Sequence, residues 1–98
     1  MKQSYKVSYK VSYKVIEVKV NEYDGDSYYY VTKIDVDQYG NTVIITSPDV
    51  LNAMKFSNYS VYIEQEKENR ELMLKLVKSY FPKENHTISY RTLTVEVK

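Results

Sequence analysis

Apolar and polar residues alternate over the first twenty positions of the chain. The tetrapeptide Ser-Tyr-Lys-Val occurs three times in tandem, from Ser4 to Val15. Because four residues are two strand periods, an extended chain places every Tyr and Val of the repeat on one face and every Ser and Lys on the other. After Val15 the apolar residues move to even positions, beginning with Ile16. The pattern predicts one long strand over residues 4–20, with a β-bulge at this phase change that keeps the apolar residues on one inner face.

Two turn sequences divide the following part of the chain into shorter strands. Asp24-Gly25 is typical of a tight hairpin, since glycine tolerates positive φ. The stretch from Gln38 to Asn41 contains Gly40 and predicts a second turn. Residues 28–37 and 42–46, which follow these turns, are rich in β-branched and aromatic residues. We therefore expect an antiparallel meander of three consecutive strands.

The second half of the chain changes to helical signals. Ser47-Pro48 is typical of a helix start and predicts a short helix over residues 48–55. The main helix is predicted over residues 64–81, and Pro82, the next residue, ends it. Its apolar positions follow helical spacing at Met73, Leu76, Val77 and Tyr80. Residues 56–63 suit a loop or a brief strand, and residues 86–97 alternate as a closing strand.

These elements predict a single α+β domain over residues 1–98. We expect the order β-β-β-α-(β)-α-β, with a curved antiparallel sheet of four or five strands and the main helix packed on one face. The first strand exceeds its hairpin partner by roughly seven residues at one end. That extra length can pair with the C-terminal strand, or with the same strand of another subunit to form a homodimer. The candidate residues of this oligomer edge are Tyr5, Val7, Tyr9 and Val11.

Composition argues against most enzymatic and cofactor chemistry. The chain has no cysteine, one histidine and two glycines, which excludes thiol chemistry, two-histidine metal sites and glycine-rich phosphate loops. Asp35 begins a stretch that resembles a calcium loop, but Thr46 stands where the bidentate glutamate is required. We therefore expect no enzyme activity, no catalytic residues, no cofactor and no metal. No apolar run is long enough to cross a bilayer, so we expect a cytoplasmic protein that does not enter a membrane.

A stripe of lysines on the first strand is the candidate nucleic-acid surface. Lys6, Lys10 and Lys14 lie on one face, about 13 Å apart at ~3.3 Å per residue. They could follow a phosphate backbone, although the net charge is only +1 and the tyrosines of the repeat point to the opposite face. The favoured interpretation is that these lysines protect a long exposed strand from edge-to-edge aggregation.

Tyrosine is the most distinctive feature of the composition, with twelve residues and no tryptophan. Binding surfaces are enriched in tyrosine because it offers a large contact area and a hydroxyl. The run from Tyr28 to Tyr30 puts aromatic side chains on both sides of the sheet. If a helix covers the face of Tyr28, an uncovered patch remains on the other face. The candidate protein-binding residues are Tyr29, Val31, Tyr39 and Tyr23; the alternative is that a helix or loop buries them.

Elimination and tyrosine content favour a small, non-enzymatic protein-binding module. The composition, rich in Lys, Tyr, Ile and Asn and without Cys, resembles that of small proteins of phages and archaeal viruses. That class includes stoichiometric inhibitors of host defence proteins, and the resemblance implies such a role in the host cytoplasm without transferring any residue. Two alternatives stay open: a nucleic-acid binder that uses the lysine face, and a homo-oligomer that assembles through a strand edge.

Overall fold

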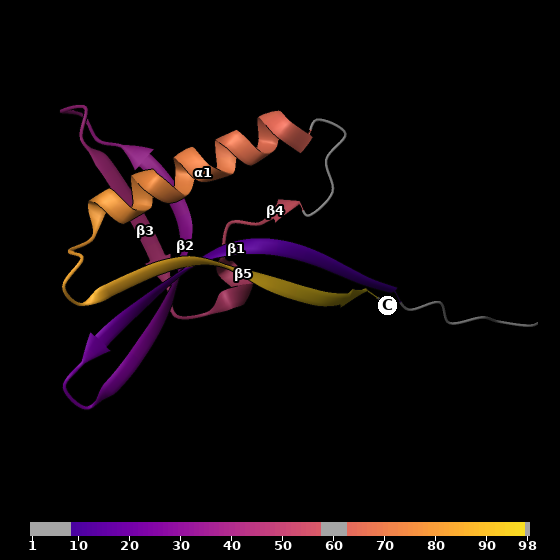
Figure 1. The fold of residues 1–98 in the computed structure, drawn as a ribbon, viewed down its shortest axis with the longest axis horizontal. Helices are drawn as coiled ribbons and strands as arrows, with labels where there is room; N and C mark the ends of the chain where they lie inside the picture. The colour runs from indigo at the N-terminus through magenta and orange to yellow at the C-terminus, as the bar shows by residue number, and fades with distance from the viewer. Residues whose placement is uncertain (1–8, 58–62, 98) are drawn as a thin grey trace, which may run out of the picture.

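The computed structural model describes residues 9–57 and 63–97, which form one twisted antiparallel sheet with a single long helix beside it (Figure 1). The fold is α+β, as the sequence predicts. In chain order the elements are β1 (Tyr9–Glu22), β2 (Gly25–Val36), β3 (Thr42–Ser47), the 3-10 turn η1 (Val50–Asn52), β4 (Phe56–Ser57), α1 (Ile63–Tyr80) and β5 (His86–Val97). The main helix and the closing strand therefore lie where the hydrophobic pattern places them.

Strand β1 is the centre of the sheet. β5 pairs with it from Tyr9 opposite Val97 to Val20 opposite His86, and β2 pairs with its last six residues, Glu17 to Glu22. Because residues 17–20 have partners in both β2 and β5, these two strands lie on opposite edges of β1. β4 pairs with Tyr13 and Lys14, on the same edge as β2, and β3 continues the sheet beyond β2. The extra length of β1 is thus paired with the C-terminal strand.

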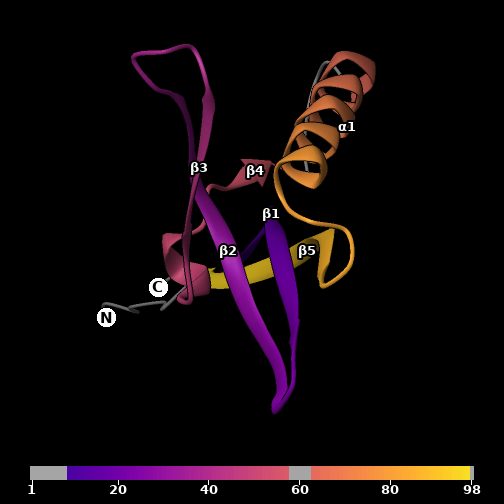
Figure 2. The same cartoon turned by 90° about the vertical axis from the view of Figure 1, so that its left-hand side faces the viewer.

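The bulge predicted in β1 is wrong. β1 and β5 pair residue for residue over twelve positions with no shift at the phase change. Instead, four consecutive residues are buried, which means that the strand is covered on both faces there: Val15, Ile16, Glu17 and Val18. α1 lies on one side of the sheet and η1 lies on the other (Figures 1 and 2). The apolar residues of β1 move from odd to even positions at Val15–Ile16 because the side of η1 is covered up to this point and the side of α1 is covered beyond it.

A bulge does occur in β2, at Thr32. The register with β3 shifts between Val31, opposite Thr46, and Lys33, opposite Ile45. Val31 and Ile34 are three residues apart and would point to opposite faces of a regular strand. The extra residue lets both pack against the core cluster, so the side chains beyond Thr32 lie on the faces opposite to those that simple alternation predicts.

The core lies between α1 and one face of the sheet. Its buried members come from β1, β2, β3, α1 and β5: Ile16, Val18, Val31, Ile44, Val77 and Ile88. Tyr29, Phe56 and Tyr90 are partly buried and pack against this cluster. The Tyr90 hydroxyl donates a 2.5 Å hydrogen bond to the Arg70 carbonyl, which ties the helix to β5.

The helix predicted over residues 48–55 is reduced to the single turn η1. Asp49, not Ser47, is its N-cap, since the Asp49 carboxylate accepts a 2.9 Å hydrogen bond from the Leu51 N–H. The Met54 N–H then donates to the Val31 carbonyl at 2.8 Å, which draws the segment back to the sheet. Of the ambiguous residues 56–63, the first two form β4, and residues 58–62 lie outside the described part of the chain.

Candidate functional site

The sheet has a second face, which points away from α1 and which we call the open face. The register defines it, because Val18 opposite Tyr29 faces the core while Glu17 opposite Tyr30 and Lys19 opposite Tyr28 point to the other side. The same alternation and register bring in side chains from β5, β2 and β3. The open face carries Glu17, Lys19, Tyr28, Tyr30, Lys33, Ile45 and Arg91.

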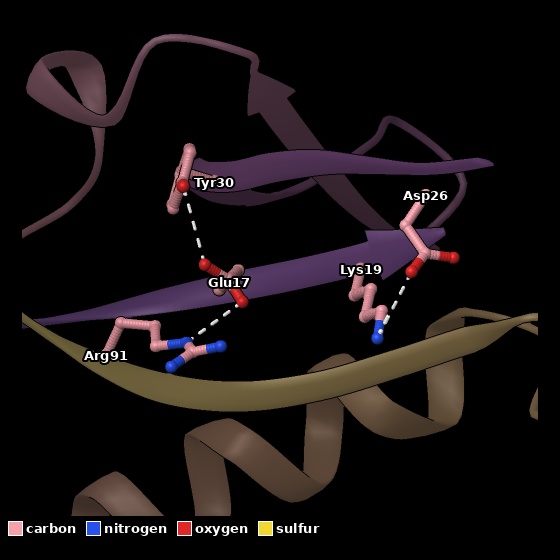
Figure 3. Close-up of polar contacts among 5 residues, drawn as sticks. All are labelled: Glu17, Lys19, Asp26, Tyr30 and Arg91. Carbon is pink, nitrogen blue, oxygen red and sulfur yellow. Dashed lines mark hydrogen bonds and ion pairs between the residues drawn. The ribbon is translucent and has the colours of Figure 1, made fainter. Parts of the chain in front are cut away.

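Three strands of this face contribute one polar row, Tyr30–Glu17–Arg91 (Figure 3). Arg91 Nε donates to Glu17 Oε1 at 3.0 Å, and the Tyr30 hydroxyl donates to Oε2 at 3.4 Å. The Glu17 side chain is only 9% exposed, whereas that of Arg91 is 61% exposed. A buried carboxylate is costly without partners, and here each of its two oxygens has one. The row therefore holds the guanidinium at a fixed place on the surface.

The pKa values of Tyr30 and Arg91 are shifted in the directions that these hydrogen bonds require. Burial, followed by the charge of Glu17, raises the pKa of the Tyr30 hydroxyl above its ordinary value. The hydrogen bond to Glu17 raises the pKa of Arg91. Near neutral pH, Tyr30 therefore remains a donor and Arg91 remains a cation.

Exposed apolar side chains lie beside the polar row. On β2, Tyr28 is two residues from Tyr30 and is 42% exposed; on β3, Ile45 is 46% exposed. Among the contacts of the described residues, Arg91 donates through Nε only, and its side chain is largely exposed. The open face thus combines an anchored arginine with an exposed tyrosine and an exposed isoleucine.

Within residues 9–57 and 63–97, the three cations that we place on the open face are each paired with an acid of the same chain. Lys19 lies 3.3 Å from Asp26 and Lys33 lies 3.2 Å from Asp35, in addition to the Arg91–Glu17 pair. These exposed lysine pairs contribute little stability, but they cancel the charge of the face. Such a surface suits a protein better than a polyphosphate chain, whose binding depends on unpaired cations.

The predicted protein-binding residues do not form one surface. Tyr29 is partly buried against the core under α1 and Val31 is fully buried, so for these two residues the alternative of burial applies and no exposed patch forms. Tyr23 and Tyr39 are exposed, but they lie in the turns of two different hairpins. Sequence reasoning missed Tyr28 and Tyr30. The two-residue turn after Glu22 fixes the hairpin register, and that register would have placed Tyr29 opposite Val18 and hence in the core.

The described repeat lysines, Lys10 and Lys14, lie on the α1 side of β1, away from the described repeat tyrosines, Tyr9 and Tyr13, as predicted. Lys14 Nζ donates to Thr92 Oγ1 at 2.8 Å and lines a shallow hollow with Arg70, Glu71 and Tyr90. Lys10 is exposed and stands opposite Glu96 in the β1–β5 register. Lys6 lies outside the described residues. Both described lysines therefore have a hydrogen-bond partner or a neighbouring acid in β5.

Two of the four residues of the predicted oligomer edge lie in the described part of the chain, and both are paired on one edge of β1. Tyr9 and Val11 pair with Val97 and Val95 of β5 on one edge of β1. Tyr5 and Val7 lie outside the residues that the structure describes. Pairing with β5 thus covers one of the two edges of β1 at Tyr9 and Val11.

The groups that might bind a metal serve local structure. Asp37 Oδ1 accepts from the backbone N–H groups of Tyr39 and Asn41 at 2.9 and 2.8 Å, and the Asn41 bond is the main reason that the pKa of Asp37 is lowered. His86 Nδ1 lies 3.1 Å from the Pro82 carbonyl oxygen, and its ring stacks on Phe81. Across residues 9–57 and 63–97, no three His, Asp or Glu side chains converge as a metal site would require.

No helix in the described part of the chain is long and apolar enough to cross a membrane. Comparison of the chain with known proteins found no matching family model, no matching curated protein and no matching solved structure.

Proposed function

We propose that this protein is a small, non-enzymatic protein-binding module and that the open face is its contact surface. The observation that carries the proposal is an exposed Tyr28 on the same face as the guanidinium of Arg91, which a buried glutamate holds in place. Tyrosine and arginine dominate the energetically important positions of protein interfaces. Because Arg91 is already held by Glu17, less side-chain entropy is lost when a partner binds it.

The geometry favours stoichiometric occupation of a partner's surface. A rigid sheet face with exposed side chains supports recognition by shape and hydrogen bonding. The compositional resemblance to virus-encoded inhibitors is the basis for proposing a host defence protein in the cytoplasm as the partner. Such a module would inhibit its partner by covering the surface to which it binds.

Nucleic acid remains the alternative ligand. Against it stand the pairing of Lys19, Lys33 and Arg91 with acids on the described open face and the hydrogen bond from Lys14 to Thr92. A nucleic-acid complex would lose affinity steeply as salt is raised, whereas a protein interface of balanced charge would not.

The test is affinity capture from a lysate of the native cell with immobilised protein in three forms. These are the wild type, an open-face variant (Tyr28→Thr with Ile45→Thr) and a matched control (Tyr39→Thr with Val36→Thr). All four replaced residues are exposed, three of them in strands, where threonine is favourable, and Tyr39 in a turn, so both variants should keep the fold, which far-UV circular dichroism checks. The captured protein is identified by mass spectrometry and titrated by calorimetry.

The expected result is one protein bound at 1:1 by the wild type and the control, with affinity for the open-face variant reduced at least about tenfold, the loss typical of one important interface residue. Equal binding by both variants would contradict the open face as the contact surface. Recovery of nucleic acid that is released by high salt would contradict the proposed function itself.

A further inference from the structure

Strand β5 forms an edge of the sheet along its whole length. It spans the twelve residues His86–Val97 and pairs with β1 on one side (yellow in Figure 1). No strand in the described part of the chain pairs with its other side. An edge strand presents a row of backbone N–H and C=O groups that are ready to pair with another extended chain.

β5 lacks the features that usually protect such an edge. It contains no proline, glycine or lysine, and its register with β1 has no bulge. Its only charged residues are Arg91 and Glu96, and Arg91 is engaged by Glu17. A long, regular edge of this kind either aggregates or is covered by a partner strand.

We infer that the edge of β5 pairs antiparallel with β5 of a second copy of this chain, which forms a two-fold dimer. Self-pairing of one edge closes the assembly, because each copy covers the edge of the other. The opposite edge of the sheet is β3, which has only six residues and faces the bulged strand β2. Head-to-tail pairing of β5 with β3 would leave half of β5 uncovered, so the length mismatch disfavours open fibres.

The sequence of β5 is compatible with itself in such a pairing. A two-fold axis perpendicular to the sheet pairs residues of the same face, and an axis through Leu93 places Thr92 opposite Thr94 of the second copy. Cross-strand Thr–Thr pairs are favourable. In this register Arg91 meets Val95 and Glu96 meets Tyr90, so no like charges face each other.

The number of hydrogen bonds is sufficient for a specific interface. With the axis through Leu93, residues 89–97 of the two copies lie opposite each other, and this nine-residue overlap contains about nine backbone hydrogen bonds, since each residue contributes one on average. A typical protein interface has about ten direct hydrogen bonds.

The dimer also has a consequence for the open face. An axis perpendicular to the sheet leaves the open faces of both copies on the same side of one continuous sheet. Arg91 of each copy would then lie close to the axis, which doubles the contact surface without any new element. The inference itself rests on the edge of β5 and does not depend on the proposed function.

Two double variants at the same positions test the register and the edge together. Thr92→Glu with Thr94→Glu places glutamate opposite glutamate twice across the axis, whereas Thr92→Glu with Thr94→Lys places glutamate opposite lysine twice. Both keep a glutamate beside Lys14 within the chain, so their folds are matched. In analytical ultracentrifugation we expect the first to weaken the dimer about tenfold and the second to retain it.

The chain has no cysteine, so single cysteines give a direct second readout. We expect Leu93→Cys to form a disulfide-linked dimer under mild oxidation, because the two thiols would meet at the axis. Tyr39→Cys, in an exposed turn, is the control and should cross-link far less. If Thr92→Cys or Thr94→Cys gave the highest yield of disulfide-linked dimer, pairing through the β5 edge would be supported and the two-fold axis would lie one residue from Leu93. Cross-linking no greater than the control, with wild type at the mass of one 11.6 kDa chain up to its solubility limit, would overturn the inference.

Discussion

At the scale of single residues, the least expected position is Glu17, a carboxylate buried in the middle of a strand. Its environment is assembled by residues that are distant in the sequence, Tyr30 on β2 and Arg91 on β5. Local pattern gives no hint of this, because alternation alone predicts that Glu17 turns outward. Glu17 does point away from the helix; it is buried because the open face is partly covered at that point.

Glu17→Gln tests how much this charge contributes. The amide keeps the shape of the carboxylate but removes its negative charge, and because its NH2 group can only donate, it can accept only one of the two hydrogen bonds that Glu17 accepts. We expect the free energy of unfolding to fall by about 1 kcal/mol, a modest value because Arg91 is largely exposed. Urea denaturation measures it, with Asp35→Asn in the exposed Lys33–Asp35 pair as the control. Equal effects of the two substitutions would show that the burial of Glu17 has no energetic weight.

Tyr30 should make stability depend on pH in the alkaline range. Its pKa in the folded protein is raised above 10.0. The neutral hydroxyl is therefore favoured by folding, and its contribution is complete below pH 10 and is lost as pH rises through the folded-state pKa. We expect the stability difference between the wild type and Tyr30→Phe to shrink above pH 10, as measured by urea denaturation. A difference that grows with pH would contradict the assignment of Tyr30 as the donor to Glu17.

At the scale of elements, the bulge in β2 decides which side chains reach the core. Thr32 is the extra residue, and its hydroxyl donates to the Ile45 carbonyl at 3.1 Å. Val31 and Ile34 share the core face because of it. A bulge depends on the partner strand as much as on its own sequence, so the alternation of β2 taken by itself could not locate it.

Deletion of Thr32 should therefore be tolerated. The remaining residues would pair as they do now, and we expect a loss of about 1 kcal/mol from the missing hydrogen bond and the changed strand twist. Deletion of Tyr30 is the matched control, because it shifts Val31 to the open face and should cost about 3 kcal/mol or more. Thermal denaturation of both variants measures the difference. If the two deletions were equally destabilising, the bulge would not be the device that sets the register.

At the scale of the whole molecule, stability is concentrated where β1 is flanked on both edges. Residues 17–20 pair with β2 and with β5 at once, and Val18 is in the core. Farther toward Tyr9, β1 pairs with β5 and, at two positions only, with β4. The sheet is therefore best protected at its centre, beneath α1.

Hydrogen exchange should follow this layout. We expect the slowest backbone amides of β1 at residues 17–20 and faster exchange at residues 9–12, because opening the centre requires most of the sheet to separate. Heteronuclear NMR in deuterated buffer gives the rates residue by residue. Slower exchange at residues 9–12 than at residues 17–20 would contradict this layout. The measurement is made on the Thr92→Glu, Thr94→Glu variant as well, so that any protection by the proposed dimer is removed.

The sequence by itself determined the fold class, the main helix, the closing strand and the two hairpin turns. Each depends on local periodicity or on a turn residue with a backbone preference, such as Gly25 and Gly40 with positive φ. Tertiary structure alone decided which face of the sheet α1 covers, and therefore which tyrosines are buried and which are exposed. Tyr29 is in the core and Tyr28 on the open face because α1 packs on one side of strands whose two faces are both partly apolar. The partner of the long first strand was likewise decided by β5, whose paired residues lie 66 to 88 positions away in the sequence, a pairing that no local pattern encodes.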